Sequence, residues 1–285
     1  MPMLGTLLSE TRTRIAPVST SASLDAQLLM AFVLGVDRAH VIAHPERELT
    51  PDQVQHFAAL AARRASGEPM AYIFARRAFY DLDLAVSPDV LIPRPETELL
   101  VELAIESAQA RRAGCVAADI GTGSGAIAVT FATHVPAAAV YAVDLSAAAL
   151  EVAHRNATLN HVQIRLLHGD LLSPLIENRV TVDLLLANLP YIASGVVPGL
   201  EVSRFEPALA LDGGPDGLVL IRRLMAAAPL VLRAGALVLL EIGADQGASA
   251  SDIVRAALPS AQVDVIQDLA GLDRIVRAVT PLNTG

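Results

Sequence analysis

The sequence predicts an α/β fold in which a small helical domain precedes a seven-stranded sheet with one antiparallel strand. Two observations support this prediction. The chain is rich in alanine and leucine at helical spacing up to about residue 75, and helical patterns alternate with short apolar strand patterns from residue 97 onward. Alternation of this kind indicates a parallel sheet with helices on both faces. We therefore expect domains at residues 1–75 and 97–285, joined by a connector at residues 76–96.

The first domain should be helical throughout. Its segments "SLDAQLLMAFVLGV" and "TPDQVQHFAALAARRASG" have helical spacing, and the second begins with Thr50 as N-cap and Pro51 at the first helical position. The stretch "AFYDLDLAVSPDVLIPRPET" then alternates apolar and polar residues and is interrupted by prolines. It predicts a short hairpin followed by an extended connector, whose fixed φ angles hold its geometry.

Seven strands are expected in the domain at residues 97–285. They lie at "CVAADI", "AAVYAVDL", "QIRLLHG", "VDLLLANLP", "ALVLLEIG", "QVDVIQD" and "DRIVRAV". Only "LAGL" separates the last two, which is too short for a crossover helix, so these two strands should pair antiparallel.

Composition and charge limit the possible functions. Apolar residues make up 53% of the chain and charged residues 18%, as in a soluble globular protein, and no apolar run reaches the roughly 18 residues of a spanning helix. The N-terminus has no signal-peptide pattern, so a cytoplasmic protein without a membrane partner is expected. A net charge of −9 opposes direct binding of nucleic acid. The single cysteine, Cys115, and seven scattered histidines give no metal-site spacing, so no metal is expected.

A glycine-rich motif, "DIGTGSGAIA" at residues 119–128, lies where the first strand of the large sheet turns into a helix. Gly121, Gly123 and Gly125 permit a tight turn and let the backbone approach a ligand. The motif alone is a weak signal. It satisfies the relaxed dinucleotide pattern with Ala126 in the final place, and a turn without any ligand is an alternative.

Two aspartates follow at the ends of the next strands. Asp144 ends the second strand, where a carboxylate can accept both hydroxyls of a ribose, so the ligand should be a nucleoside. Asp170 ends the third strand, where it either accepts a proton from an exocyclic amine or caps a helix. No tyrosine-lysine pair or histidine suggests a hydride-transfer site. S-adenosylmethionine, which needs a glycine turn, a ribose acid, an adenine contact and a nucleophile, is therefore the expected cofactor.

Five segments in order resemble the HemK family, the N5-glutamine methyltransferases of peptide chain release factors. They are "LIPRPETELLVE", "DIGTGSGAIA", "AVDLSAAALEVAHRNA", "ANLPYI" and "FEPALALDGGPDGL". The resemblance runs from about residue 20 to about residue 278. It implies a class I methyltransferase domain with a Rossmann-like sheet, a helical domain that recognises the release factor, and methylation of the glutamine in the Gly-Gly-Gln loop, which modulates translation termination.

Carried over by position, the resemblance implies two sets of site residues. The cofactor set is Gly121, Thr122, Gly123, Ser124, Gly125, Asp144, Asp170, Leu171 and Asn188. The catalytic set is Asn188, Leu189, Pro190 and Tyr191. The chain departs from the family at two of these positions, because Leu189 replaces the first proline of Asn-Pro-Pro-Tyr and Leu171 stands where many members have an aromatic residue.

The catalytic set suggests how a glutamine side chain could be activated. An amide nitrogen is a poor nucleophile because its lone pair is delocalised into the carbonyl. If the Asn188 side-chain oxygen and the Leu189 carbonyl each accept one amide hydrogen, the nitrogen is oriented and its growing positive charge is stabilised. Pro190 biases Leu189 towards an extended conformation. Tyr191 either covers the face of the amide or is a core tyrosine.

Two other functions stay open at this point. Asn-Leu-Pro-Tyr is similar to the motif of ribosomal RNA adenine dimethyltransferases, although these are expected to be basic and to lack "LIPRPETE". A non-catalytic cofactor-binding module would require "NLPY" to be an ordinary turn. In a strand order of 3-2-1-4-5-7-6, the glycine turn and "NLPY" follow neighbouring strands beside the switch point, where ligands bind. This placement favours an enzyme.

Overall fold

The computed structural model describes residues 2–111 and 114–282, which form two compact units at residues 1–75 and 76–285. The first unit is a helical bundle that buries Leu29, Phe57 and Leu60 in its own core. Its helices are α1 (Leu4–Ile15), α2 (Ala22–Leu34), α3 (Arg38–Ala43), α4 (Pro51–Ala65) and α5 (Met70–Phe74).

Polar contacts set the beginning of α4 and join it to α2. Thr50 is the N-cap and Pro51 lies in the first turn, as the sequence predicts, and Gln53 completes a reciprocal capping box with Thr50. The buried Asp25 carboxylate of α2 accepts a hydrogen bond from Arg64 Nε of α4 at 2.7 Å. Two helices that are far apart in sequence are therefore joined by a charged pair within the bundle.

The second unit opens with the antiparallel hairpin of β1 (Arg76–Phe79) and β2 (Leu82–Ala85). Phe79 and Leu84 are buried in the core of this unit. The buried Asn156 side chain accepts from the Ala85 backbone at 2.6 Å and donates to the Ala85 and Ser124 carbonyl oxygens. One amide thus joins the hairpin to the glycine turn.

The large sheet has seven strands in the order β5-β4-β3-β6-β7-β9-β8, and β9 runs antiparallel to both of its neighbours. This confirms the predicted fold and strand order. The strands are β3 (Val116–Ile120), β4 (Ala139–Asp144), β5 (Arg165–His168), β6 (Val182–Ala187), β7 (Leu232–Glu241), β8 (Gln262–Gln267) and β9 (Asp273–Val279).

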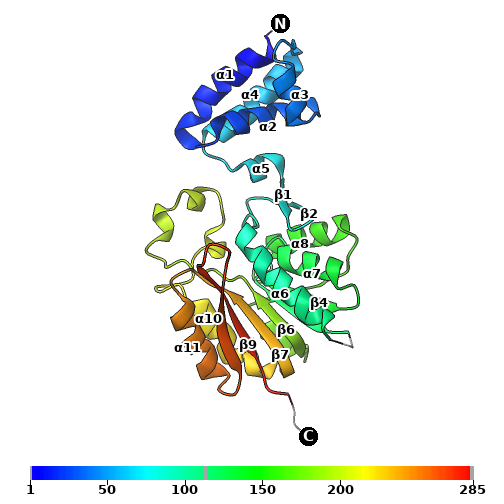
Figure 1. Ribbon diagram of the computed structural model, residues 1–285, viewed down its shortest axis with the longest axis vertical. Coiled ribbons are helices and arrows are strands. Elements are labelled where there is room, and N and C mark those ends of the chain that lie inside the picture. Colours follow the sequence, from blue (N-terminus) through cyan, green and yellow to red (C-terminus); the bar gives the residue numbers. More distant parts are fainter. Residues whose placement is uncertain (1, 112–113, 283–285) are drawn as a thin grey trace. The chain divides into compact units, whose positions relative to one another are not determined.

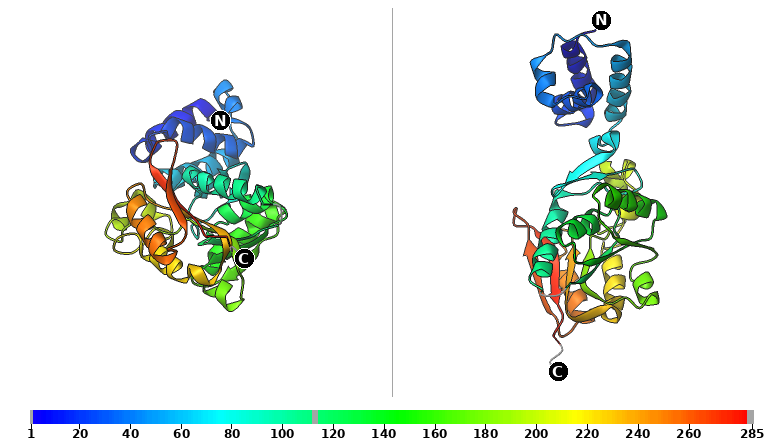
Figure 2. Two further views of the ribbon diagram at one scale, coloured as in Figure 1. Left: turned by 60° about the horizontal axis from the view of Figure 1, so that its bottom comes forward. Right: turned by 90° about the vertical axis from the view of Figure 1, so that its right-hand side faces the viewer.

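Helices cover both faces of this sheet, as Figures 1 and 2 show. Successive strand residues point to opposite faces, so Leu184 and Leu186 of β6 join one core cluster while Leu185 and Ala187 join the other. The first cluster includes side chains of α6 (Glu98–Gln109), α7 (Ala126–His134) and α8 (Ala147–Leu159), and the second those of α9 (Ser173–Glu177), α10 (Val219–Ala227) and α11 (Gly247–Ala257). Burial on both faces explains why these strands are continuously apolar.

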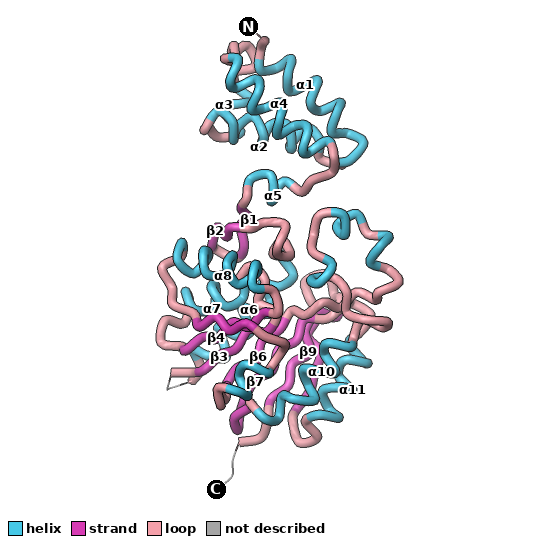
Figure 3. The backbone as a smooth tube through the Cα atoms, turned by 180° about the vertical axis from the view of Figure 1, so that it is seen from behind, coloured by secondary structure: helices cyan, strands magenta, loops and turns pink. Residues whose placement is uncertain are grey.

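A long loop with several short helical turns connects β6 to α10 at the carboxyl end of β6 (Figure 3). Its second half packs backbone to backbone against the residues that follow β6. Ile192 and Asp212 form a parallel bridge, and Gly213 N donates to Ile192 O at 2.8 Å. A Cβ added at Gly213 would lie 2.5 Å from Pro190 O, so this approach requires glycine.

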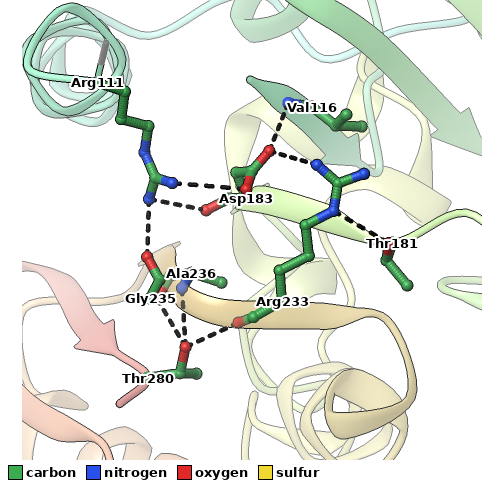
Figure 4. A network of polar contacts seen from close by, with 8 residues as sticks. All are labelled: Arg111, Val116, Thr181, Asp183, Arg233, Gly235, Ala236 and Thr280. Atoms are coloured by element: carbon green, nitrogen blue, oxygen red, sulfur yellow. Dashed lines mark hydrogen bonds and ion pairs between the residues drawn. The ribbon is translucent and has the colours of Figure 1, made fainter. Parts of the chain in front are cut away.

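Asp183, near the start of β6, connects the strands at the opposite, amino end of β6 (Figure 4). Its carboxylate, only 14% exposed, accepts hydrogen bonds from Val116 N at 2.9 Å and Arg233 Nη1 at 2.7 Å. Arg111 forms an ion pair with the same carboxylate at 3.5 Å and donates to Gly235 O at 2.8 Å. One carboxylate therefore joins β3, β6, β7 and the segment after α6.

Asp183→Ala should lower the free energy of unfolding by about 2 kcal/mol, because Val116 N loses its acceptor and Arg111 and Arg233 lose the carboxylate that they share. Chemical denaturation monitored by circular dichroism measures this change. Asp252→Ala is the matched control, since its pair with Arg255 is exposed and should contribute almost nothing. Equal stability of the two variants would contradict a structural role for Asp183.

Candidate active site

A cavity of about 330 Å³ lies at the carboxyl ends of β3, β4, β5 and β6. Its walls contain the glycine turn after β3, the ends of β4 and β5, and the segment after β6. The connector around residues 90–97 and the loop around residues 207–212 complete it. The cavity occupies the switch point that the strand order predicts, and it lies entirely within the second unit.

The glycine turn is shaped by backbone conformation and by a buried carboxylate. Gly121, Gly123 and Gly125 all have positive φ, between 54° and 79°. Asp119 accepts hydrogen bonds from the Thr122 hydroxyl at 2.6 Å and from Ala128 N at 3.2 Å. Burial raises the pKa of Asp119 to about 7, and these two hydrogen bonds oppose that effect.

The three glycines of the turn differ in what surrounds them. Gly123 lines the cavity, and no atom within 4 Å would meet a Cβ added there, so a side chain would take up cavity space. Gly125 lies outside the cavity lining, and a Cβ there would lie 3.0 Å from Ala153 Cβ of α8. Close packing against α8 explains why glycine is required at position 125. Contact between Gly125 and the cofactor stays a prediction.

Asp144 is half-buried beside the glycine turn. Its Oδ2 accepts from Gly123 N and its Oδ1 from Ser146 N, both at 2.8 Å. Each carboxylate oxygen has a second lone pair, so the group can still accept two hydroxyl hydrogens. A ribose diol therefore fits the donors and acceptors at this position.

Asp170 and Leu171 line the far end of the same cavity. The Asp170 side chain does not cap α9, whose N-cap residue is Leu172; instead it forms an ion pair with Arg223 of α10. Leu171 has a φ of 49°, a left-handed conformation that costs energy for a residue with a side chain. An aliphatic side chain is thus held at the wall where the sequence predicts an adenine contact.

The "NLPY" segment contributes three residues to the cavity wall, Asn188, Leu189 and Pro190. The Leu189 side chain is buried, and its Cδ2 atom would lie 2.9 Å from a Cβ added at Gly121. Leucine thus fills the space that the absence of a side chain at Gly121 leaves open. Tyr191 is absent from the lining; burial, together with Glu241, raises the pKa of its hydroxyl.

Two side chains that sequence reasoning missed, Thr97 and Glu241, lie beside Asn188. Asn188 Nδ2 donates to Thr97 Oγ1 at 2.9 Å. Behind them, Glu241 ends β7 and is 1% exposed. Burial raises the pKa of Glu241 to about 7, while the neighbouring Thr97 hydroxyl and Asn188 amide act in the opposite direction. The one signal in the sequence was a lone carboxylate ending the apolar run "ALVLLE".

A second missed contact joins the connector to the loop before α10. Arg94 Nη2 donates to both carboxylate oxygens of Glu206, at 2.8 and 2.6 Å, and Glu206 is buried. Burial raises the pKa of Glu206, and Arg94 opposes this shift. Both segments line the cavity, so this ion pair fixes the spacing of two of its walls.

Comparison with known proteins connects this geometry to a family. A family model described as the PrmC N-terminal domain matches residues 6–74, and the Methyltransferase small domain matches residues 96–203. The release factor glutamine methyltransferase of Moorella thermoacetica is 43% identical over 254 residues, covering 88% of this chain and 89% of the relative. The chain belongs to the release factor glutamine methyltransferase family. The enzyme of the same name from Xylella fastidiosa (strain 9a5c) is 44% identical over 260 residues, or 88% of this chain and 91% of the relative.

This assignment confirms the resemblance that the sequence motifs indicated, and the chain is an S-adenosylmethionine-dependent methyltransferase. A methyltransferase from Pyrococcus furiosus shares the fold, with a TM-score of 0.52 and 19% identity over 71% of this chain and 91% of the other. The alternatives of an RNA adenine methyltransferase and a non-catalytic module gain no support from these relatives. Within residues 2–111 and 114–282, no helix has the length and apolarity to cross a membrane.

Proposed function

We propose that this chain transfers a methyl group from S-adenosylmethionine to the side-chain nitrogen of the glutamine in the Gly-Gly-Gln motif of peptide chain release factors. The observation that carries the proposal is the position of Asn188. Its side-chain nitrogen donates to Thr97, an orientation in which the oxygen can accept a hydrogen bond from a substrate, and the residue lines a cavity that also contains Asp144 and the glycine turn. Mass spectrometry of a release factor incubated with the enzyme and cofactor tests it, by the gain of one methyl group on that glutamine.

The cofactor would be held along the carboxyl ends of β3, β4 and β5. Backbone groups of the glycine turn would contact its amino acid part, the Asp144 carboxylate its ribose, and the wall formed by Asp170 and Leu171 its adenine. When bound, the cofactor would supply an electrophilic methyl group, whose bond to sulfur breaks as its bond to the glutamine nitrogen forms, so that S-adenosylhomocysteine leaves and the nitrogen releases one of its protons to water. Asp170 keeps its ion pair with Arg223 in this arrangement, because each carboxylate oxygen has more than one lone pair.

The catalytic contribution of the protein would be to orient and polarise the glutamine amide. The Asn188 side-chain oxygen and the Leu189 carbonyl accept its two hydrogens and so localise the nitrogen lone pair. Both bonds strengthen as positive charge develops on the nitrogen, which lowers the barrier. Leu189 lines the cavity, and Pro190 favours an extended backbone at the residue before it, which supports a role for the Leu189 main-chain oxygen.

Recognition of the release factor would depend on the helical unit at residues 1–75. A short glycine-rich loop offers little contact area, and a separate surface is needed for affinity. The bundle has suitable apolar side chains, because Phe32 packs against Phe74 with ring centroids 4.9 Å apart and is still 43% exposed. Ile42 is exposed on the same unit.

Removing residues 1–74 should leave cofactor binding intact while methylation of the whole release factor falls, because the expected docking surface is lost. Phe32→Glu in the full chain should raise the KM for the release factor with little change in kcat. Steady-state kinetics at low substrate concentration measures both effects. Leu230→Glu is the matched control, since Leu230 is exposed just before the amino end of β7, away from the cavity at the carboxyl ends of the strands. Unchanged turnover by the truncated chain would exclude a recognition role.

A further inference from the structure

Three side chains lie together at the carboxyl ends of β6 and β7, namely Glu241, Thr97 and Asn188. Glu241 is buried at the end of β7, and its Oε2 has no hydrogen-bond partner within the described part of the chain. Leu240 pairs with Ala187 in the parallel register of β6 and β7, so Glu241 and Asn188, the next residue of each segment, lie side by side. The Thr97 hydroxyl and the Asn188 amide both act to lower the pKa of this carboxyl. Thr97 occupies the N-cap position of α6, but its hydroxyl does not cap that helix and instead accepts from Asn188 Nδ2. Threonine is a favoured N-cap residue, but here its hydroxyl contacts Asn188 and not the helix backbone.

The direction of the hydrogen bonds among these three side chains depends on whether the Glu241 carboxyl group is ionised. An ionised carboxylate only accepts hydrogen bonds, so the Thr97 hydroxyl must donate to it. The threonine oxygen then accepts from the amide nitrogen of Asn188, which leaves the Asn188 oxygen to face the substrate. A protonated carboxyl can donate to the Thr97 oxygen instead. The Thr97 hydroxyl can then donate to the Asn188 oxygen, and the amide is rotated so that its NH2 group, not its oxygen, faces the substrate.

We infer that Glu241 and Thr97 are positioning residues, and that the Glu241 carboxylate, acting through the Thr97 hydroxyl, fixes the Asn188 amide with its oxygen towards the glutamine that is to be methylated. This inference rests on the proposed function and adds two residues to the same site. Neither side chain touches the reacting atoms in this arrangement. Their effect is on the fraction of enzyme in which Asn188 presents an acceptor.

Ionisation of Glu241 should therefore control the rate in the neutral range. The charged and titratable groups around it are Arg274 of β9, which favours the carboxylate, and Glu96 of the connector, which disfavours it. Tyr191 also couples to Glu241. Since burial raises the pKa of Glu241 to about 7, the competent carboxylate form is present above that pH and is lost as the pH falls through it.

The test uses the full chain, S-adenosylmethionine and a purified release factor, with kcat and KM measured from pH 5.5 to 8.5. In the wild type, kcat should rise with pH through an apparent pKa near 7. Glu241→Gln should abolish that step, because glutamine has no titrating group and can donate as well as accept.

Thr97→Val, which has nearly the same shape, should lower kcat about tenfold, as expected for one lost hydrogen bond in a charged network. Thr97→Ser should restore most of this loss.

Cofactor affinity by calorimetry and the KM for the release factor should change little in all three variants, which separates positioning from folding or binding. A Thr97→Val variant as fast as the wild type, a Thr97→Ser variant as slow as Thr97→Val, or a pH step that persists in Glu241→Gln would each overturn the inference. These outcomes require a wild-type enzyme that methylates the glutamine. If the wild type leaves the glutamine unmodified at every pH, the proposed function fails and the inference fails with it.

Discussion

Asn188→Ala should lower the rate of methyl transfer by a factor on the order of 10² to 10³, the usual effect of deleting one polar contact made in the transition state. The variant loses the oxygen that accepts a glutamine hydrogen and faces the positive charge growing on the nitrogen. Cofactor affinity should fall much less, because Asp144 and the glycine turn are unchanged. Single-turnover methylation of a release factor at saturating cofactor separates the chemical step from binding.

Asn188→Asp is the matched variant for this prediction. A carboxylate keeps an acceptor for the glutamine amide and should retain more activity than alanine. It lacks the Nδ2 donor that bonds Thr97 at 2.9 Å, so it should stay below the wild type. Transfer by Asn188→Ala at the wild-type rate would mean that "NLPY" is only a turn and that the proposed mechanism is wrong.

Asp144→Ala should weaken binding of S-adenosylmethionine by about 10²-fold to 10³-fold, as expected for the loss of two hydrogen bonds to a charged acceptor. The same change removes the acceptor of Gly123 N and Ser146 N, so the glycine turn also loses its support. Calorimetric titration with the cofactor measures the effect. Gly123→Val tests the same site by shape, since a branched side chain at a φ of 54° is strained and faces the cavity.

Asp144→Asn is the control for charge. Its amide keeps one oxygen to accept hydrogen bonds and nearly the same volume, so its affinity should lie between those of the wild type and Asp144→Ala. Tight cofactor binding by both Asp144→Ala and Gly123→Val, or preferential binding of NAD, would rule out this site.

Much of the fold could be predicted because its signals are local and periodic. The seven strand patterns, the short "LAGL" turn and the Thr50 cap each involve neighbouring residues, and the structure contains all of them. The glycine turn and Asp144 could also be placed together, since the carboxyl ends of adjacent parallel strands meet at one edge. Their contact is direct, with Gly123 N bonded to Asp144.

The sequence by itself determined the parallel sheet, the position of the cavity at its switch point and the family, because hydrophobic periodicity and contiguous motifs carry that information. Only the tertiary structure decided how the site is completed. Three contacts join residues that are far apart in the sequence: Asn188 with Thr97 (91 positions), Asp170 with Arg223 (53 positions) and Glu206 with Arg94 (112 positions). Glu241 likewise gains its raised pKa only once the packed core has excluded water from it. Such contacts depend on side-chain packing between distant segments and on burial, and neither leaves a periodic pattern in the chain.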